Sequence, residues 1–236
     1  MQWLWPTPVM FAEFEGDDVN HHNTELERVV ISGCNTQAGS IHELRLYDLH
    51  QTQSESVAWL AQRIKESAAV YCGFSSSVGI EVGLRGVVLR AFDHINTHTE
   101  ARESDLGVAY WPSGNPSVVG QAINQNADGF IAPIFTLEDP SRHLSDLRLP
   151  MEMRHSFDVC PRPGLMAIFP AHLPHNMHPY RGEKPFIHIV AQVRMPWPTD
   201  YFRGNLWFIL QRKLSRSLTP MAISKRPSTK CPSQMR

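Results

Sequence analysis

Hydrophobic and polar residues follow a helical period in one long segment near the start of the chain, SESVAWLAQRIKESAAVY at residues 54–71. The apolar residues that would share one face are Val57, Leu60, Ala61, Ile64 and Ala68. This spacing predicts an amphipathic helix capped by Ser54 or Ser56. A second helical pattern, NTELERVVI at residues 23–31, follows a run from Trp3 to Phe14 whose alternation predicts an edge strand. We expect both helices to pack outside a sheet.

The pattern changes after Gly73 to short β-rich runs separated by Gly, Pro, Asn and Asp. These runs are IEVGL, GVVLRAF, LGVAYW, FIAPIF, LMAIFP and FIHIVAQV. Short strands that follow one another without intervening helices are typical of a sandwich or jelly roll and not of alternating β-α-β units. The fold class we expect is therefore mainly β with flanking helices, a cupin-like double-stranded β-helix (jelly roll) with its core at residues 75–196.

Composition narrows the class of protein further. The 236 residues include 22 basic and 23 acidic side chains, so the net charge of −1 gives no global field that favours a polyanionic partner. We expect one domain over residues 1–212 and a basic, disordered tail over 213–236, because residues 203–236 contain no acidic side chain. The four cysteines form no CxxC pair and no eighteen apolar residues run together, which predicts reduced thiols, no membrane span and a cytoplasmic location.

Two histidine-containing segments offer ligands for a metal. His98 and Glu100 follow the run GVVLRAF, and a His-x-Glu pair at a strand end projects both side chains to one face. After the run LMAIFP the chain offers His172, His175 and His178, any of which could be a third ligand. Two histidines and one carboxylate leave three octahedral positions open, as in iron(II) oxygenases. Taken alone the pair is a weak motif, since twelve histidines and 23 acids also produce it by chance on a surface loop.

Four blocks in the same order resemble small members of the 2-oxoglutarate/iron(II) oxygenase superfamily. The opening LWPTPVMFAEFEG resembles their FPTPV strand, and HTEARESDLGVAYWP resembles their metal loop and the strand after it. LEDPSRH resembles their DPR stretch, and GLMAIFPAHLPHNMHP resembles the strand and turn that carry their last histidine. The resemblance runs from about Trp3 to Met195. It implies Fe(II) as the metal, with 2-oxoglutarate and O2 as co-substrates.

The resemblance assigns the metal ligands residue by residue. It puts the first ligand at His98, the second at Glu100 and the third at His175. The other two histidines of the later segment fall on positions that are not ligands in that group. His94 is an alternative to His98, which we prefer because only His98 carries the paired carboxylate. Glu100 stands where the superfamily more often has Asp, but it supplies the same anionic oxygen, so coordination survives the change.

The carboxylate anchor of 2-oxoglutarate departs from the superfamily pattern. The superfamily places an Arg at the start of the strand after the last histidine, whereas this strand reads RGEKPFIHIVAQV. Lys184 and Arg181 precede the strand and are the basic candidates, and His188 lies within it with the same parity as Lys184. Both basic residues also fit solvated loop charges. In that case the anchor lies elsewhere, and Arg90 is a further candidate.

Three polar residues are candidates for contacts around the metal. Tyr110 lies on the run after the metal loop, where superfamily members bind 2-oxoglutarate or substrate, although a Tyr at a strand end is also often structural. We expect Asn124 and Arg142 to contact the substrate. Arg142 belongs to the block that resembles DPR, in which Asp139 before a proline also suits a simple turn.

The resemblance implies a dioxygenase that oxidises a C–H bond of a small molecule by hydroxylation, desaturation or cyclisation, while 2-oxoglutarate becomes succinate and CO2. An amino acid or an intermediate of secondary metabolism fits the short chain. We expect no nucleic-acid or membrane partner, and a monomer or homodimer. Two alternatives stay open: a cupin-type metal enzyme that does not use 2-oxoglutarate, and a non-catalytic jelly-roll binding module.

Overall fold

The computed structural model describes residues 7–36, 44–100, 104–113, 133–138, 156–180, 182 and 184–196. The chain divides into a compact unit, Met1–Met195, and a second unit, Pro196–Arg236, of which only Pro196 is described. The predicted domain end at residue 212 and the predicted tail therefore lie outside the described residues. None of the helices in the described ranges combines the length and the hydropathy that a membrane span requires.

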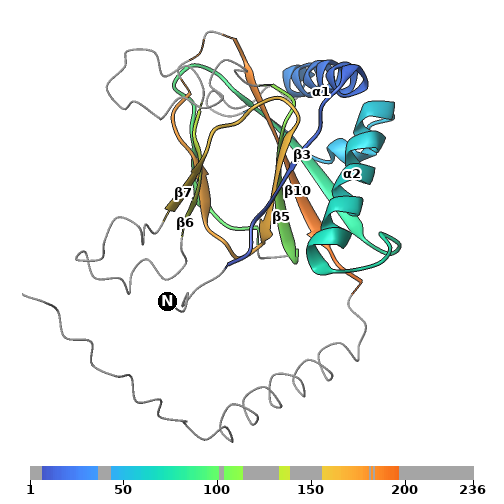
Figure 1. The fold of residues 1–236 in the computed structure, drawn as a ribbon. Helices are drawn as coiled ribbons and strands as arrows, with labels where there is room; N and C mark the ends of the chain where they lie inside the picture. The colour runs from blue at the N-terminus through green and yellow to red at the C-terminus, as the bar shows by residue number, and fades with distance from the viewer. Residues whose placement is uncertain are drawn as a thin grey trace, which may run out of the picture. The chain divides into compact units, whose positions relative to one another are not determined.

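The described part of the first unit consists of two α-helices, one short 3-10 helix and ten strands (Figure 1). In chain order they are β1 (Met10–Glu13), α1 (Asp17–Thr36), β2 (Leu44–Leu46), the 3-10 helix η1 (Leu49–Gln51), α2 (Glu55–Cys72), β3 (Glu81–Leu89), β4 (Ile95–His98), β5 (Leu106–Trp111), β6 (Phe135–Glu138), β7 (Ser156–Val159), β8 (Leu165–Pro170), β9 (His175–Met177) and β10 (Phe186–Arg194). Both predicted helices are present, and α1 begins earlier than its hydrophobic pattern suggests.

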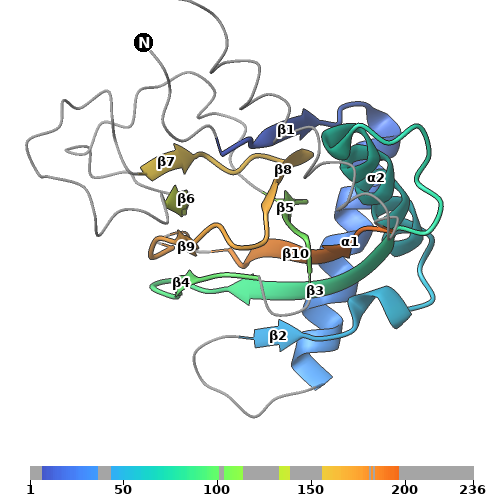
Figure 2. The ribbon, with the colours of Figure 1, turned by 90° about the horizontal axis from the view of Figure 1, so that it is seen from below.

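The strands form two antiparallel sheets that face each other (Figures 1 and 2). The larger sheet has the order β1-β8-β5-β10-β3-β2, and the smaller has the order β4-β9-β6-β7. Strand β1 lies at an edge of the larger sheet, as its sequence predicts. The predicted fold class, mainly β with flanking helices in a jelly roll, is confirmed.

Some strand boundaries differ from the prediction. The runs IEVGL and GVVLRAF form one continuous strand, β3, instead of two. Gly86 interrupts the apolar pattern of β3 because a Cβ there would lie 2.7 Å from the side chain of Val30 on α1, so glycine allows the helix to approach the sheet. Four short strands, β2, β4, β7 and β9, were not predicted, since three or four residues carry too little periodicity to detect.

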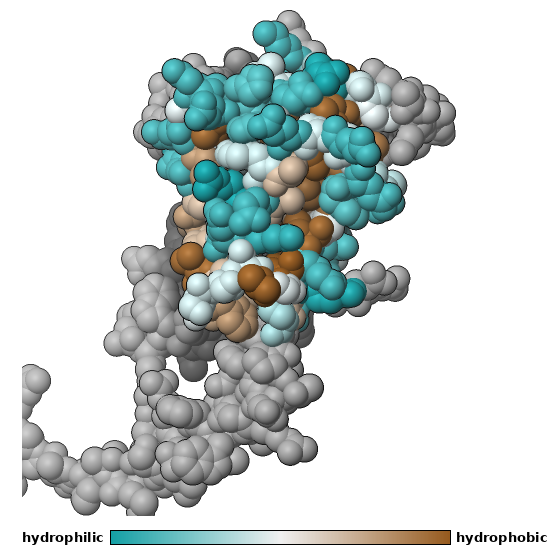
Figure 3. Space-filling model, turned by 90° about the vertical axis from the view of Figure 1, so that its right-hand side faces the viewer, coloured by the Kyte–Doolittle hydropathy of each residue, from teal (hydrophilic) through white to brown (hydrophobic). Residues whose placement is uncertain are grey.

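Helices α1 and α2 cover the outer face of the larger sheet (Figure 1). The face of α2 that carries Leu60, Ile64 and Ala68 is fully buried, as its spacing predicts. Figure 3 shows the side of the molecule on which the helices lie, where hydrophilic side chains predominate and hydrophobic ones lie between them. The opposite, inner face of the larger sheet is therefore the one that faces the smaller sheet.

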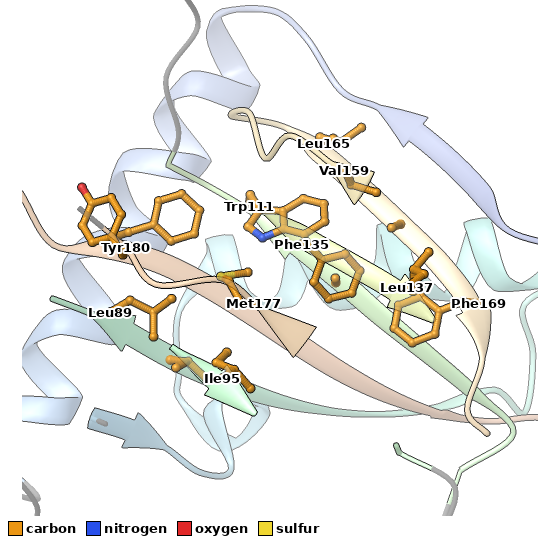
Figure 4. Close-up of a cluster of buried hydrophobic side chains, with 14 of the residues drawn as sticks. Leu89, Ile95, Trp111, Phe135, Leu137, Val159, Leu165, Phe169, Met177 and Tyr180 are labelled. Atoms are coloured by element: carbon orange, nitrogen blue, oxygen red, sulfur yellow. The ribbon is translucent and has the colours of Figure 1, made fainter. Parts of the chain in front are cut away.

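The space between the sheets is filled by a cluster of buried hydrophobic side chains (Figure 4). Trp111 of β5, Phe135 of β6, Phe169 of β8 and Met177 of β9 are each at most 1% exposed. Because strand side chains alternate, the members of this cluster also identify which residues of each strand point inward. The same alternation brings the polar residues described below into the interior.

Candidate metal centre

His98, Glu100 and His175 lie on neighbouring segments of the smaller sheet. His98 ends β4 and His175 begins β9, and the two histidines are direct cross-strand partners with ring centroids 4.3 Å apart. Glu100 follows two residues after His98, so its side chain returns to the same side of the extended chain. One ligand atom of each residue lies within 4.8 Å of the other two. Among the described residues, no other His, Cys, Asp and Glu side chains converge in this way.

The hydrogen bonds of the two histidines determine which ring nitrogen faces the centre. His98 Nδ1 lies 2.8 Å from the carbonyl oxygen of Asn96, and His175 Nδ1 lies 3.0 Å from that of Leu173. A carbonyl oxygen only accepts, so each Nδ1 carries the proton and Nε2 of the neutral ring keeps a lone pair. His98 Nε2 is 3.4 Å from Glu100 Oε1. Two acceptor atoms at this distance repel each other unless a cation, either a proton or a metal ion, lies between them.

The pKa values of the buried groups favour forms that bind a cation. Burial acts to raise the pKa of Glu100, but the side chains of His98 and Gln192 and the positive charge of Arg85 outweigh it and lower the pKa to about 2. Burial lowers the pKa of His175 to about 4. At neutral pH the centre therefore offers an ionised carboxylate and an unprotonated imidazole, both of which are metal-binding forms.

Glu100 is held by two side chains from the larger sheet. Arg85 of β3 donates from Nη2 to Oε1 over 3.0 Å, and Gln192 of β10 donates from Nε2 to Oε2 over 2.6 Å. The backbone of Glu100 is fixed as well, because its N–H donates to Ala171 and its carbonyl oxygen accepts from the hydroxyl of Ser104. The carboxylate is thus oriented from both sheets, although it belongs to a segment next to the smaller one.

Arg85 and Gln192 are the site residues that sequence analysis missed. Arg85 is the single residue between the two runs IEVGL and GVVLRAF, which the sequence pattern predicts as separate strands. Its parity with the buried Val87 and Leu89 of the same strand is the signal that would have found it, because it places a charged side chain on the inner face. Gln192 likewise shares its face of β10 with His188.

The other candidate histidines do not join the centre. His94, His172 and His178 are exposed, and none belongs to the converging cluster. His178 Nε2 instead lies 3.0 Å from the hydroxyl of Thr136. Of the alternatives that the sequence leaves open, the structure brings only His98 and His175 together with Glu100.

The candidates for 2-oxoglutarate and substrate contacts are dispersed. Tyr110 points away from the interior, since its hydroxyl donates to Asn23 Oδ1 of α1 on the outer face of the larger sheet. Lys184 and Arg90 are exposed, whereas His188 is 2% exposed and faces the interior. Arg181, Asn124 and Arg142 lie outside the described residues.

Among the described residues, the buried polar atoms without a hydrogen-bond partner include His188 Nδ1, Trp111 Nε1 and Arg85 Nε. The ring of His188 stacks on that of Trp111, with centroids 5.7 Å apart and an interplanar angle of 24°. An unpaired buried polar atom is costly, and native interiors rarely leave several together. This part of the interior is therefore suited to a polar ligand with acceptor groups.

The fold is that of the iron/2-oxoglutarate-dependent oxygenases, as the resemblance in the sequence predicts. A scan of protein-family models finds no match for the sequence, and a search of curated proteins finds none either. Solved structures do resemble this chain in fold, and those described below are 10–14% identical to it in sequence.

Three of these structures represent the similarity. AviO1 from Streptomyces viridochromogenes Tue57 has a TM-score of 0.56 at 10% identity, over 80% of this chain and 90% of its own. A prolyl-4-hydroxylase from Pseudomonas putida has a TM-score of 0.51 at 12% identity, over 80% and 92%. The epimerase SnoN, in complex with Fe3+, alpha ketoglutarate and nogalamycin RO, has a TM-score of 0.54 at 14% identity, over 80% and 79%.

Proposed function

We propose that this protein is a mononuclear non-haem Fe(II)- and 2-oxoglutarate-dependent dioxygenase that oxidises a C–H bond of a small molecule. His98, Glu100 and His175 hold the iron. The observation that carries the proposal is that three acceptor atoms converge within 4.8 Å, with the proton of each histidine held on the far side of its ring. This donor set, two imidazoles and one carboxylate, is the one that leaves room on Fe(II) for a chelating co-substrate and O2.

When bound, iron(II) allows 2-oxoglutarate and O2 to oxidise the substrate, with one oxygen atom entering succinate as CO2 is lost and the other hydroxylating the C–H bond. The protein's own groups hold and shield the centre. Phe135 and Phe169 contact the ring of His175 at centroid distances of 5.6 and 4.9 Å, so water is excluded from its buried side. Gln192 and Arg85 keep the carboxylate of Glu100 directed at the centre.

The interior also suits 2-oxoglutarate. A dicarboxylate needs donors in a buried site, and Arg85 and Trp111 present unpartnered N–H groups there. His188 stacks on Trp111 and is part of the proposed co-substrate pocket. Lys184 and Tyr110 do not enter this proposal, because the first is exposed and the second bonds to α1 on the other face of the sheet.

A small molecule is the proposed substrate class, with hydroxylation, desaturation and cyclisation all open as outcomes. The proposal rests on the similarity of fold to a protein whose structure contains a nogalamycin compound, which makes an intermediate of secondary metabolism a suitable first substrate to test. Asn124 and Arg142 remain the proposed substrate contacts.

Metal and co-substrate binding test the proposal directly. Under anaerobic conditions the protein should bind one Fe(II), and adding 2-oxoglutarate should produce the visible charge-transfer absorption of a chelate. His98→Ala and His175→Ala should each lower metal affinity by about 100-fold or more, and His178→Ala, which removes a histidine outside the cluster, should not.

The outcomes separate the alternatives. Metal binding without the absorption band and without succinate formation would indicate a cupin-type enzyme that does not use 2-oxoglutarate. Metal content that is equally low in the wild-type protein and both alanine variants would indicate a binding module and contradict the proposal.

A further inference from the structure

Arg85 brings a fixed positive charge to the inner face of β3. Its side chain is 21% exposed, and Nη2 lies 3.0 Å from Glu100 Oε1. Oxygen Oε1 is also the carboxylate atom nearest to His98 Nε2, at 3.4 Å. Arg85 therefore donates to the same oxygen that faces the first histidine of the centre. A metal ion bound by His98 and Glu100 would therefore have to share Oε1 with the guanidinium of Arg85.

Arg85 is not the only group that orients Glu100. Gln192 holds the other oxygen over 2.6 Å, and both backbone polar groups of Glu100 are bonded, to Ala171 and Ser104. Removing Arg85 would leave these contacts in place. The main effect of Arg85 on a divalent cation at the centre is thus repulsion by a like charge and competition for Oε1, which weaken metal binding.

Arg85 also has capacity for a second anion. Its Nε is buried without a partner, and the unpartnered Nε1 of Trp111 and Nδ1 of His188 lie in the same interior. A guanidinium whose N–H groups are only partly used is suited to a further carboxylate, because charge-assisted hydrogen bonds are the strong ones. In the described part of the strand that should carry the anchor, no arginine lies near its start.

We propose that Arg85 is the residue that binds the free carboxylate of 2-oxoglutarate, and that it does so while it limits the metal affinity of Glu100. This inference rests on the proposed function. It predicts that loss of the guanidinium changes the two affinities in opposite directions: metal binding becomes tighter and 2-oxoglutarate binding becomes weaker. A residue that only supported the fold of the site would weaken both.

Binding measurements with Mn(II), which supports no turnover, test the inference. Mn(II) affinity is measured from the loss of the free-ion EPR signal, and 2-oxoglutarate affinity by calorimetry on the Mn(II)-loaded protein. Arg85→Met should lower the dissociation constant for Mn(II) by about tenfold and raise that for 2-oxoglutarate by about 30-fold or more. Arg85→Lys keeps the charge and should leave Mn(II) affinity within about threefold, while 2-oxoglutarate still binds more weakly.

Arg63→Met is the matched control, because it removes an arginine that pairs with Glu66 on the exposed side of α2 and should change neither affinity. The inference is wrong if both Arg85 variants bind both ligands as the wild type does, or if Arg85→Met weakens both. If Arg85→Met does not fold, Arg85→Lys alone tests the inference, which is wrong if this variant binds 2-oxoglutarate as tightly as the wild type does. Failure of the wild-type protein to bind Mn(II) would overturn the proposed function itself, and the inference with it.

Discussion

Each histidine of the candidate centre is oriented by a backbone carbonyl two residues before it, Asn96 for His98 and Leu173 for His175. Many metal-binding histidines instead depend on a carboxylate or another side chain for this bond. Here the orientation comes with the local backbone at the end of β4 and the start of β9. The acceptors are main-chain atoms, so the backbone of these two segments determines which ring nitrogen faces the candidate centre.

One glycine on the larger sheet provides space for a residue that supports His175. A Cβ at Gly107 would lie 2.6 Å from the ring of Phe169, which contacts His175. We expect Gly107→Ala to lower the free energy of unfolding by about 1–3 kcal/mol, because the ring must shift in a close-packed core. Urea denaturation measures the change.

Gly83 is the matched control for this substitution. It also lies in a strand of the larger sheet, but a Cβ there meets no atom within 4 Å. Gly83→Ala should therefore leave stability unchanged or raise it by up to about 1 kcal/mol, since alanine restricts the unfolded chain more than glycine does. Equal losses in the two variants would contradict the argument from space.

At the scale of single residues, the sequence predicted the members of the centre better than their surroundings. Strand alternation over two residues offered His98 and Glu100 as a candidate pair, and the resemblance of the ordered sequence blocks selected them together with His175. Arg85 lies on β3 of the larger sheet and Glu100 follows β4 of the smaller sheet, so their contact depends on how the two sheets face each other. Parity places Arg85 on the inner face of its strand, but its contact with Glu100 is between segments that a single sequence does not show to be neighbours, because such contacts leave no periodic trace.

The docking of α1 on the sheet includes one buried polar contact, in which the Tyr110 hydroxyl of β5 donates to Asn23 Oδ1. Both side chains are at most 5% exposed. This bond gives the helix a fixed position along the strand, which apolar packing alone specifies less strictly.

A double-mutant cycle measures that contact. Tyr110→Phe leaves the amide of Asn23 buried with its acceptor unpaired, so we expect a loss of about 1–3 kcal/mol in the free energy of unfolding. The double variant, with both Tyr110→Phe and Asn23→Ala, should lose less free energy of unfolding than the sum of the losses of the two single variants. Strict additivity, with no coupling of at least about 0.5 kcal/mol, would show that the bond contributes nothing specific.

Helices and long strands were predicted from sequence and short strands were not, for a physical reason. Helix α2 repeats its apolar positions over several turns, so the helical period can be recognised from many residues at once. Strands β4 and β9 have four and three residues and are defined by their pairing with other strands, β4 with β9 and β9 also with β6. The candidate histidines lie on these two strands. The sequence therefore predicted the histidines as candidate ligands but did not predict the strands on which they lie.

For the molecule as a whole, the buried histidines make stability depend on pH. Burial lowers the pKa of His175 to about 4 and that of His188 well below its usual value. In the unfolded chain both return to about 6.5. Below pH 6.5 the unfolded chain takes up protons that the folded chain does not, so stability is full above that pH and falls as the solution becomes more acidic.

We therefore expect the free energy of unfolding of the chelator-treated protein to fall between pH 6.5 and 5, by up to about 2.7 kcal/mol per pH unit for two histidines. Urea denaturation at several pH values measures the slope. His188→Leu removes one of the two groups and should reduce the slope by about half. A stability that is constant over this range would mean that both histidines take up protons in the folded protein as readily as in the unfolded chain.

His98 and His175 face each other in space but belong to distant parts of the chain. During synthesis the first histidine leaves the ribosome long before the second, and the pairing of β4 with β9 must close a long loop before the two rings meet. A metal ion thus has no assembled site early in folding. An ion that binds the finished centre would act mainly by slowing unfolding and would do little to speed the formation of the fold.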